Sequence, residues 1–324
     1  MRAVEKNGLD LRFAKEELKN NPKVVKIAVQ QNGAALEFAS PNLKKDPEIV
    51  RLAILQNGWE LQYASANLQN DLDLVKLAIE KNGYALKFAS LTLRNDPETV
   101  KLAVQKHGWA LEHASLERRD DFEIVKLAVK QYGSALEFAS DRLKKNPEIV
   151  KSAIKQNGFA LTYVDKEFQK DPEIIKLALR QNGLVLGVIS LNLQTREIVK
   201  IAVQQNGKAL RNADENFIND PEIVKLAVQN YGQALKFTSD PELQNHRDIV
   251  KLAVQQDGRV LRFLLDSLQN DREIVMLAVQ QNGMALEHAS PLLRKDREIV
   301  KSAVQQDPAA LQFVSEELIG KNLF

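Results

Sequence analysis

A 25-residue motif repeats along almost the whole chain of 324 residues. Its most regular marker is a glycine, found at positions 8, 33, 58, 83, 108, 133, 158, 183, 207, 232, 258 and 283, with Pro308 in the thirteenth place. Only two intervals deviate, one of 24 residues before Gly207 and one of 26 residues before Gly258. A unit this short cannot bury an apolar face alone, so it must stack on its neighbours. The period therefore predicts a solenoid.

Each repeat carries the signals that start and end a helix. In the repeat that begins at Asp46, the aspartate is a preferred N-cap and Pro47 suits the first helical position. Glu48 places a negative charge at the positive end of the helix dipole. Asn57 and Gly58 close the segment, and we expect this pair to form a left-handed C-cap. An α-helix is predicted between these two signals.

The apolar residues of this first helix cover about 200°, wider than the stripe of a one-sided surface helix. They are Ile49, Val50, Leu52, Ala53 and Ile54. Such a helix needs neighbours on both flanks. Alanine stands at the Ala53 position in all thirteen repeats, which predicts a close approach between helices.

A second, short helix is predicted over residues 59 to 65, with a further turn capped at Ser65. Leu61 recurs as leucine in all thirteen repeats. The expected fold is all-α: an α-solenoid of about thirteen repeats, each with one α-helix and one short α- or 3-10 helix, wound as a right-handed superhelix. We expect residues 1–324 to form a single continuous repeat domain, irregular around 183–266, with a local bend or softer packing there. No capping repeat is apparent at either end, which suggests a longer protein or pairing through the ends.

Composition restricts the classes of function. The formal net charge is only +2, which gives no strong overall attraction to nucleic acid or to an anionic membrane. The absence of cysteine excludes disulfides and thiolate chemistry and fits a cytoplasmic-type reducing compartment. No apolar run approaches the roughly 20 residues of a membrane-spanning helix. We expect a soluble protein that does not bind membranes.

The consensus DPEIVxLAxxQNGxxLxxAS, with a leucine following, resembles the repeat family called domain of unknown function 4116. The resemblance covers nearly the whole chain, and the family's unit corresponds to two 25-residue repeats. Members occur in intracellular bacteria and giant viruses. The resemblance therefore suggests an effector or host-interaction protein, which could be secreted into a host cell, but it supplies no activity and no site residues.

Two further patterns have structural explanations. The first helix has lysine or arginine at one position in eleven of twelve repeats, as at Lys26 and Arg51. This row could track a phosphate backbone, but each cation also follows an acid by three residues, the spacing of an intrahelical pair. The four histidines lie in separate repeats at structural positions, without carboxylates at ligand spacing. We expect no metal site, no cofactor, no catalytic residue and no enzymatic activity.

The variable positions of the short helix carry the most functional information. The residue after the glycine and the one three positions later share one face of that helix. Along the chain this face changes from aromatic to basic. The aromatic members are Trp59, Tyr84, Trp109 and Phe159, and the basic members are Lys208, Arg211, Lys236, Arg259 and Arg262.

Partly exposed aromatic and arginine side chains are enriched in binding hot spots. The alternative is that the aromatic rings fill gaps between repeats. Our leading hypothesis is a non-enzymatic scaffold that binds a protein or peptide, anchored by the aromatic residues and by an acidic segment on the basic ones. The alternatives are single-stranded nucleic-acid binding, with rings stacked on bases, and an inert spacer within a larger protein. The sequence does not specify the partner.

Overall fold

The computed structural model describes residues 2–315 and residue 318. The chain divides into two compact units, unit 1 (Met1–Phe168) and unit 2 (Gln169–Phe324), each of which is described by itself. All regular structure in the described residues is helical. The predicted all-α repeat architecture is therefore confirmed. The single continuous domain and the hand of the superhelix stay predictions.

The first segment of each repeat is a ten-residue α-helix, as the cap signals predict. In unit 1 these helices are α3 (Pro22–Gln31), α4 (Pro47–Gln56), α5 (Leu72–Lys81), α6 (Pro97–Lys106), α8 (Phe122–Gln131) and α10 (Pro147–Gln156), preceded by the shorter α1 (Arg2–Lys6). In unit 2 they are α11 (Pro172–Gln181), α12 (Arg196–Gln205), α14 (Pro221–Asn230), α16 (Arg247–Gln256), α18 (Arg272–Gln281) and α19 (Arg297–Gln306).

The second segment is a 3-10 helix of six residues that begins at the recurrent glycine. In unit 1 these are η1 (Gly8–Phe13), η2 (Gly33–Phe38), η4 (Gly58–Tyr63), η6 (Gly83–Phe88), η7 (Gly108–His113), η8 (Gly133–Phe138) and η9 (Gly158–Tyr163). In unit 2 they are η11 (Gly183–Val188), η13 (Gly207–Asn212), η14 (Gly232–Phe237), η15 (Gly258–Phe263), η16 (Gly283–His288) and η18 (Pro308–Phe313).

A third, shorter helical turn completes most repeats and corresponds to the extension predicted after Ser65. The turns of unit 1 are α2 (Glu16–Lys19), η3 (Leu43–Lys45), η5 (Leu68–Asn70), α7 (Leu116–Arg119) and α9 (Asp141–Lys144). Those of unit 2 are η12 (Leu191–Leu193), α13 (Glu215–Ile218), α15 (Pro241–Gln244), α17 (Asp266–Gln269) and η17 (Leu293–Lys295), and η10 (Phe168–Lys170) lies at the boundary.

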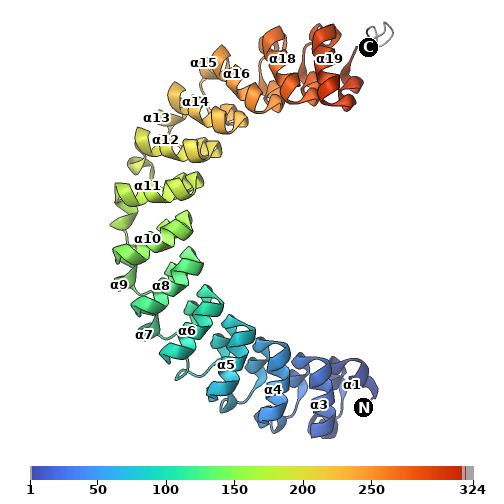
Figure 1. Ribbon diagram of the computed structural model, residues 1–324, viewed down its shortest axis with the longest axis vertical. Helices are drawn as coiled ribbons and strands as arrows, with labels where there is room; N and C mark the ends of the chain where they lie inside the picture. Colours follow the sequence, from blue (N-terminus) through green and yellow to red (C-terminus); the bar gives the residue numbers. More distant parts are fainter. Residues whose placement is uncertain (1, 316–317, 319–324) are drawn as a thin grey trace. The chain divides into compact units, whose positions relative to one another are not determined.

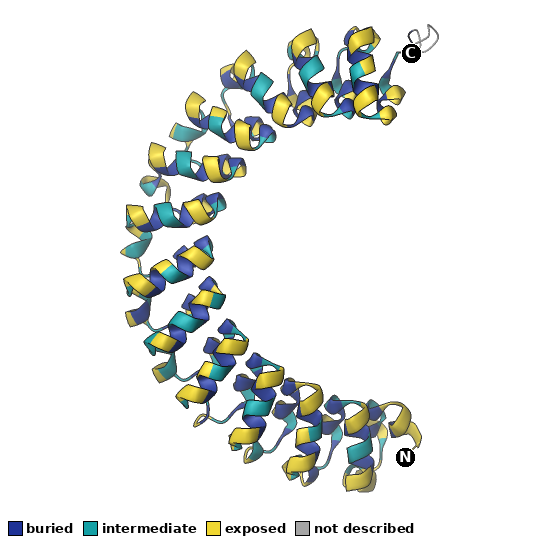
Figure 2. Ribbon diagram, viewed as in Figure 1, coloured by how far each residue is buried: buried dark blue, intermediate teal, exposed yellow. Residues whose placement is uncertain are grey.

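Within each unit the α-helices pack side by side in chain order, and the 3-10 helices form a second row (Figure 1). A 3-10 helix contacts the α-helix of its own repeat and that of the next, as η4 does with α4 and α5. The core lies between these rows. Figure 2 shows buried positions where neighbouring helices meet and exposed positions on the remaining faces. In α4, Ile49, Val50, Ala53 and Ile54 are fully buried.

The helix N-caps form as predicted. The Asp46 Oδ1 atom accepts hydrogen bonds from the backbone N–H groups of Glu48, at 2.9 Å, and Ile49, at 3.2 Å. Ser140 caps the third segment in the same manner, since its Oγ atom accepts from Leu143 N at 3.3 Å. The cap predicted at Ser65 is wrong, because its buried Oγ atom has no hydrogen-bond partner among the described residues. Short polar side chains therefore set where most segments begin.

The left-handed C-cap predicted at Asn-Gly is wrong. Asn57 is extended, with φ −153° and ψ 125°, and its Oδ1 atom instead caps the next 3-10 helix by accepting from Trp59 N. Glycine is required for a different reason, namely close packing between repeats. A Cβ atom on Gly133 would lie 2.2 Å from the carbonyl oxygen of Ala153 in the following α-helix. The invariant alanine and the recurrent glycine thus face each other, as the close approach predicted for alanine requires.

A glutamine near the end of the α-helix joins neighbouring repeats. The Gln56 Oε1 atom accepts from Gly33 N at 2.8 Å, and its Nε2 atom donates to Val29 O at 2.6 Å and Gln30 O at 2.9 Å. One side chain therefore satisfies backbone groups that the preceding helix end leaves without intrahelical partners. The same bond to glycine comes from Gln131, Gln156, Gln205, Gln256, Gln281 and Gln306, and from Asn230.

A backbone hydrogen bond closes most repeats, and we call it the closing bond. It runs from the residue that follows the 3-10 helix by two positions to the carbonyl 21 residues earlier, as from Ser140 N to Arg119 O at 2.9 Å. In the irregular region side chains take over this role. The Gln194 Oε1 atom accepts from Asp214 N at 2.8 Å, and the Asn219 Oδ1 atom accepts from Ser239 N at 3.0 Å.

Candidate partner-binding surfaces

The four predicted aromatic residues all lie in unit 1, and we call them the aromatic surface: Trp59, Tyr84, Trp109 and Phe159. Each is the second residue of a 3-10 helix. Asparagine caps hold three of their backbones, since the N–H groups of Trp59, Tyr84 and Phe159 donate to the preceding Asn side chain at 3.0–3.1 Å. The Trp59 side chain is exposed and the other three are partly exposed.

The indole rings also pack forward on the next repeat. The ring centroids of Trp59 and Phe88 are 5.5 Å apart in an edge-to-face arrangement, and those of Trp109 and Phe138 are 5.7 Å apart. Both geometries lie in the favourable range for aromatic pairs. The two tryptophans therefore fill gaps between repeats, as the alternative explanation predicts, and still present part of each ring to solvent.

A column of three rings beside them was not anticipated. Tyr84 lies 4.4 Å from His107 between ring centroids, and His107 stacks on Tyr132 at 4.7 Å and 15°. Burial lowers the pKa of His107, so its imidazole is neutral at neutral pH. In the sequence, His107 and Tyr132 stand where most repeats have the asparagine that caps the 3-10 helix. This replacement is the sequence feature that marks the column. Tyr132, 40% exposed, extends the aromatic surface.

The five predicted basic residues all lie in unit 2, on η13, η14 and η15, and all five are exposed. We call Lys208, Arg211, Lys236, Arg259 and Arg262 the basic surface. Arg259 is already paired, because its Nε atom lies 2.9 Å from Asp257 Oδ1, and this carboxylate raises the pKa of Arg259. In the described part of the chain, the other four cations have no ion pair within 4.0 Å.

Three of the unpaired cations lie over aromatic rings. The Lys208 Nζ atom is 5.1 Å from the Tyr231 ring centroid, and the Lys236 Nζ atom is 5.8 Å from that of Phe263. The Arg262 guanidinium lies 4.2 Å from the same Phe263 ring. Cation–π contacts hold these side chains in place without neutralising their charge.

The lysine row on the α-helices is different, because five of its eleven cations pair with an acid of the next repeat: Lys26, Lys126, Lys176, Lys200 and Lys251. Lys126 pairs with Glu148 at 2.6 Å and Lys251 with Glu273 at 2.7 Å, each in the next repeat. The intrahelical pairing expected at three-residue spacing is therefore mostly wrong; Lys176 contacts Glu173 in its own helix at 3.3 Å but lies closer, at 2.9 Å, to Glu197 of the next. Successive α-helices lie side by side, so the neighbouring acid is nearer than the intrahelical one.

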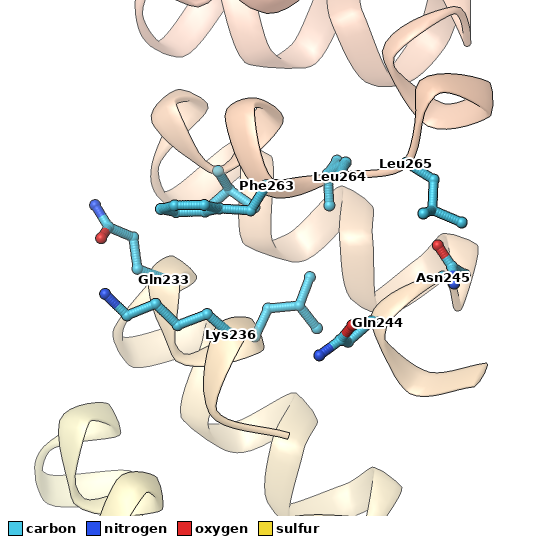
Figure 3. Close-up of a pocket in the computed structure, with 9 residues that line it drawn as sticks. Gln233, Lys236, Gln244, Asn245, Phe263, Leu264 and Leu265 are labelled. Atoms are coloured by element: carbon cyan, nitrogen blue, oxygen red, sulfur yellow. The ribbon is translucent and has the colours of Figure 1, made fainter. Parts of the chain in front are cut away.

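A cavity of about 140 Å³ opens beside the basic surface, between η14 and η15. Figure 3 shows Phe263 above Gln233 and Lys236, with Leu265 opposite Gln244 and Asn245. Leu235, Val260 and Leu264 complete the lining. No candidate residue other than Lys236 predicted this site, but the 26-residue interval before Gly258 marked its location.

A second hollow lies in the same irregular region. It is lined by Gly187 and Asn212, among others, where most repeats have a larger residue and an aromatic ring. Two packing defects therefore occur between residues 183 and 266, although the bend and the softness expected there stay predictions.

In the residues that the structure describes, no three His, Asp or Glu side chains gather in a group that could hold a metal ion. Burial lowers the pKa of His113, and His246 makes no side-chain capping bond. Among the described helices, none has the length and apolar character needed to cross a membrane.

The chain was also compared with known proteins. No curated protein matches it. The family model for a domain of unknown function, DUF4116, matches residues 1–44, 46–94, 71–119, 96–144, 121–169, 146–194, 195–244, 246–294 and 271–319. Each match is about as long as two 25-residue repeats, so the family's unit spans two of them. On these matches, which cover nearly all of its length, the chain belongs to the DUF4116 family.

Proposed function

We propose that the protein is a non-enzymatic scaffold that binds a protein or peptide carrying an acidic segment. The observation that supports this best is the contrast between two sets of cations. Five cations of the α-helix row pair with acids of the next repeat, whereas Lys208, Arg211, Lys236 and Arg262 are all unpaired on successive 3-10 helices, three of them over aromatic rings. Unpaired, exposed cations beside aromatic rings give carboxylates a site with electrostatic and apolar contacts.

The aromatic surface of unit 1 supports the same proposal independently. Trp59 and Tyr132 keep exposed ring area while their backbones are held in regular repeats. Rigid aromatic side chains make contact area available at low conformational cost. An effector that acts on a host protein is one form such a scaffold takes, so a host-cell lysate is the first source of partners to test.

The experiment is affinity capture from that lysate with the full chain, with and without nuclease and at about 0.5 M salt, where charge contacts are strongly screened. We expect a protein that survives nuclease, is released by salt, and is lost with the double variant Lys236→Glu/Arg262→Glu. Lys225→Glu is the matched control, because Lys225 is exposed on α14 of the same unit, away from the basic surface. A partner retained equally by both variants would contradict this assignment.

Single-stranded nucleic acid is the second candidate, favoured by the adjacency of Lys236 and Phe263, since such proteins combine basic grooves with ring stacking. This second function predicts that the chain binds a fluorescent oligothymidine, with an affinity that falls steeply as the salt concentration rises. Recovery only of nuclease-sensitive material would replace the protein-binding proposal with this one. A chain that captures nothing under any condition would support the spacer.

A further inference from the structure

We propose that the cavity between η14 and η15 is an anchor site for one apolar side chain, of leucine or phenylalanine size, carried by an acidic peptide. This inference rests on the proposed function and adds to it a specific position and a side-chain class. Three features of the cavity support it: the extra residue beside which it forms, its apolar wall, and the unpaired cations at its mouth.

The cavity arises from the extra residue of the 26-residue interval. The regular segment Phe138-Ala139-Ser140-Asp141-Arg142-Leu143 has a counterpart, Phe237-Thr238-Ser239-Asp240-Pro241-Glu242-Leu243, that is one residue longer. The added residue lies at the start of α15, whose last residue, Gln244, lines the cavity. The defect is thus encoded in the chain length and is a constant feature of this repeat.

The same insertion leaves a closing bond unmade. Regular repeats would join Leu265 N–H to Gln244 C=O, as Ser290 N joins Gln269 O at 2.9 Å in the next repeat. No such bond links Leu265 and Gln244 in this described segment, and both residues line the cavity. A backbone donor and a backbone acceptor therefore stand at its edge. An extended peptide can bond to both through its own backbone, as peptides do when they pair with free backbone edges.

One wall of the cavity is apolar and favours an apolar group, while Gln233, Lys236, Gln244 and Asn245 line the rest. Leu235, Val260 and Leu264 are almost fully buried and form this wall, and the Phe263 ring, 45% exposed, lies at the mouth (Figure 3). An apolar protein cavity of roughly 150 Å³ can hold a benzene molecule. At about 140 Å³, this cavity has room for one aromatic or branched aliphatic side chain and little more.

The charges around the mouth select the flanking residues. Lys236 and Arg262 are exposed and unpaired, and the nearby Asp257 carboxylate is engaged by Arg259 at 2.9 Å and by Gln233 at 2.7 Å. The rim is therefore net positive. A peptide with acidic residues on both sides of its apolar side chain would place carboxylates near these cations. A basic peptide would be repelled.

The test uses defined probes and the full chain. The fluorescein-labelled peptide acetyl-Glu-Glu-Phe-Glu-Glu-amide is titrated by anisotropy beside the same peptide with Ala in place of Phe, and beside a Lys-flanked Phe peptide. We expect the Phe peptide to bind at least about ten-fold more tightly than the Ala peptide, which corresponds to roughly 1.4 kcal/mol. We expect no binding of the Lys-flanked peptide, and amide protection on binding confined to residues 233–265.

Two variants separate the parts of the site. Deletion of Pro241 restores the regular spacing, and we expect it to close the cavity and abolish the preference for Phe over Ala. Lys236→Glu should weaken both acidic peptides together, whereas Lys225→Glu should change neither. Circular dichroism and thermal unfolding verify that each variant folds; if the deletion variant does not fold, Leu265→Trp, at an exposed position on the cavity edge, serves to block the mouth.

The outcomes distinguish this inference from the proposed function. Equal binding of the Phe and Ala peptides, lost in Lys236→Glu, overturns the cavity as an anchor and leaves the basic surface as a binding site. No binding of either peptide at millimolar concentration also overturns the anchor, while lysate capture that depends on Lys236 and Arg262 would leave the proposed function in place. Tighter binding of oligothymidine than of the Phe peptide, lost in Lys236→Glu, overturns both.

Discussion

Unit 1 and unit 2 are built from the same repeat, yet they join neighbouring repeats differently. In unit 1 the first position of the ten-residue α-helix is proline, leucine or phenylalanine, and backbone closing bonds recur from Ser40 to Asp165. In unit 2 arginine takes that first position at Arg196, Arg247 and Arg272, and each reaches the N-cap aspartate of the next repeat. Side chains replace closing bonds in the irregular region, which also holds the cavity between η14 and η15 and the hollow around Asn212.

The difference shows what an apolar core of this type tolerates. The alanine, leucine and glycine positions that bury the helices are kept in both units, while the polar connections between repeats vary. A closing bond made by a side chain, or left unmade, does not dismantle the stack, because the core residues on either side stay buried. The change does expose backbone N–H and C=O groups and leave a cavity between the two repeats. The cavity between η14 and η15 and the hollow around Asn212 both lie where these connections depart from the regular pattern.

The largest effect should follow from filling a close contact in unit 1. We expect Gly133→Ala to destabilise its repeats by about 3 kcal/mol, since the new Cβ would lie 2.2 Å from the Ala153 carbonyl oxygen. Gly187→Ala, at a non-recurrent glycine of the irregular region in unit 2, is the contrasting change and should be nearly neutral, because its Cβ would meet only the movable Asn212 amide, at 2.9 Å. Native-state hydrogen exchange, resolved by peptide, measures both; equal costs would contradict the comparison.

A reciprocal exchange tests the hollow around Asn212. In unit 1, Phe138→Asn removes the ring that packs on Trp109, and we expect a loss of about 2 kcal/mol for this partly buried side chain. In unit 2, Asn212→Phe supplies the ring that most repeats have, and we expect a gain of about 1 kcal/mol from cavity filling. Thermal and urea unfolding of the full chain measure both the expected loss and the expected gain of stability. Destabilisation by Asn212→Phe would show that the hollow is not available to a ring.

Unit 1 has an unsatisfied buried group at Glu60, where most repeats have alanine. This side chain is 6% exposed, and its Oε2 atom has no hydrogen-bond partner. We expect Glu60→Ala to stabilise the protein by about 1 kcal/mol at neutral pH, because an unsatisfied buried polar group is removed. Glu80→Ala, at an exposed position of the same unit, is the control.

The gain from Glu60→Ala should depend on pH. Burial raises the pKa of Glu60, so the folded protein holds this proton more tightly than the unfolded chain does. Below the pKa that Glu60 has in the unfolded chain, the side chain is protonated in both states and its burial carries no cost of ionisation. The wild type loses stability as the pH rises through the pKa that Glu60 has in the folded protein. The advantage of the alanine variant should shrink toward acid pH, measured by urea unfolding between about pH 4 and 7. An advantage that grows toward acid would contradict the raised pKa.

The smallest effect should come from the arginine bridges of unit 2. Arg247 contacts both Asp271 and Glu273 of the next repeat, but the pairs are solvent-exposed and screened by salt. We expect Arg247→Ala to raise hydrogen exchange slightly in α16 and α18 at low salt, with the difference vanishing at high salt. Lys225→Ala, at an unpaired lysine in the same unit, should show no such salt dependence.

Several features of the molecule were readable from the sequence because they depend on short chain separations. Asp46 caps the helix that begins one residue later, and Ile49, Val50 and Ala53 share a buried face through helical periodicity. The exposed positions of Lys208 and Arg211 also followed, since they share one face of a six-residue helix. Local hydrogen bonding and periodicity set all of these before any repeat meets another.

Tertiary structure decided what depends on contact between repeats. Gly58 is needed because the carbonyl of Ala78 lies against it, although its sequence context suggests a left-handed cap. Lys126 pairs with Glu148, 22 residues away, because side-by-side stacking brings that acid within reach. The same stacking places Lys236 over the Phe263 ring of the next repeat, and one added residue accompanies a cavity between these two repeats. The repeating sequence determines the structure of each 25-residue repeat. The packing between neighbouring repeats determines which polar and charged groups stay unpaired.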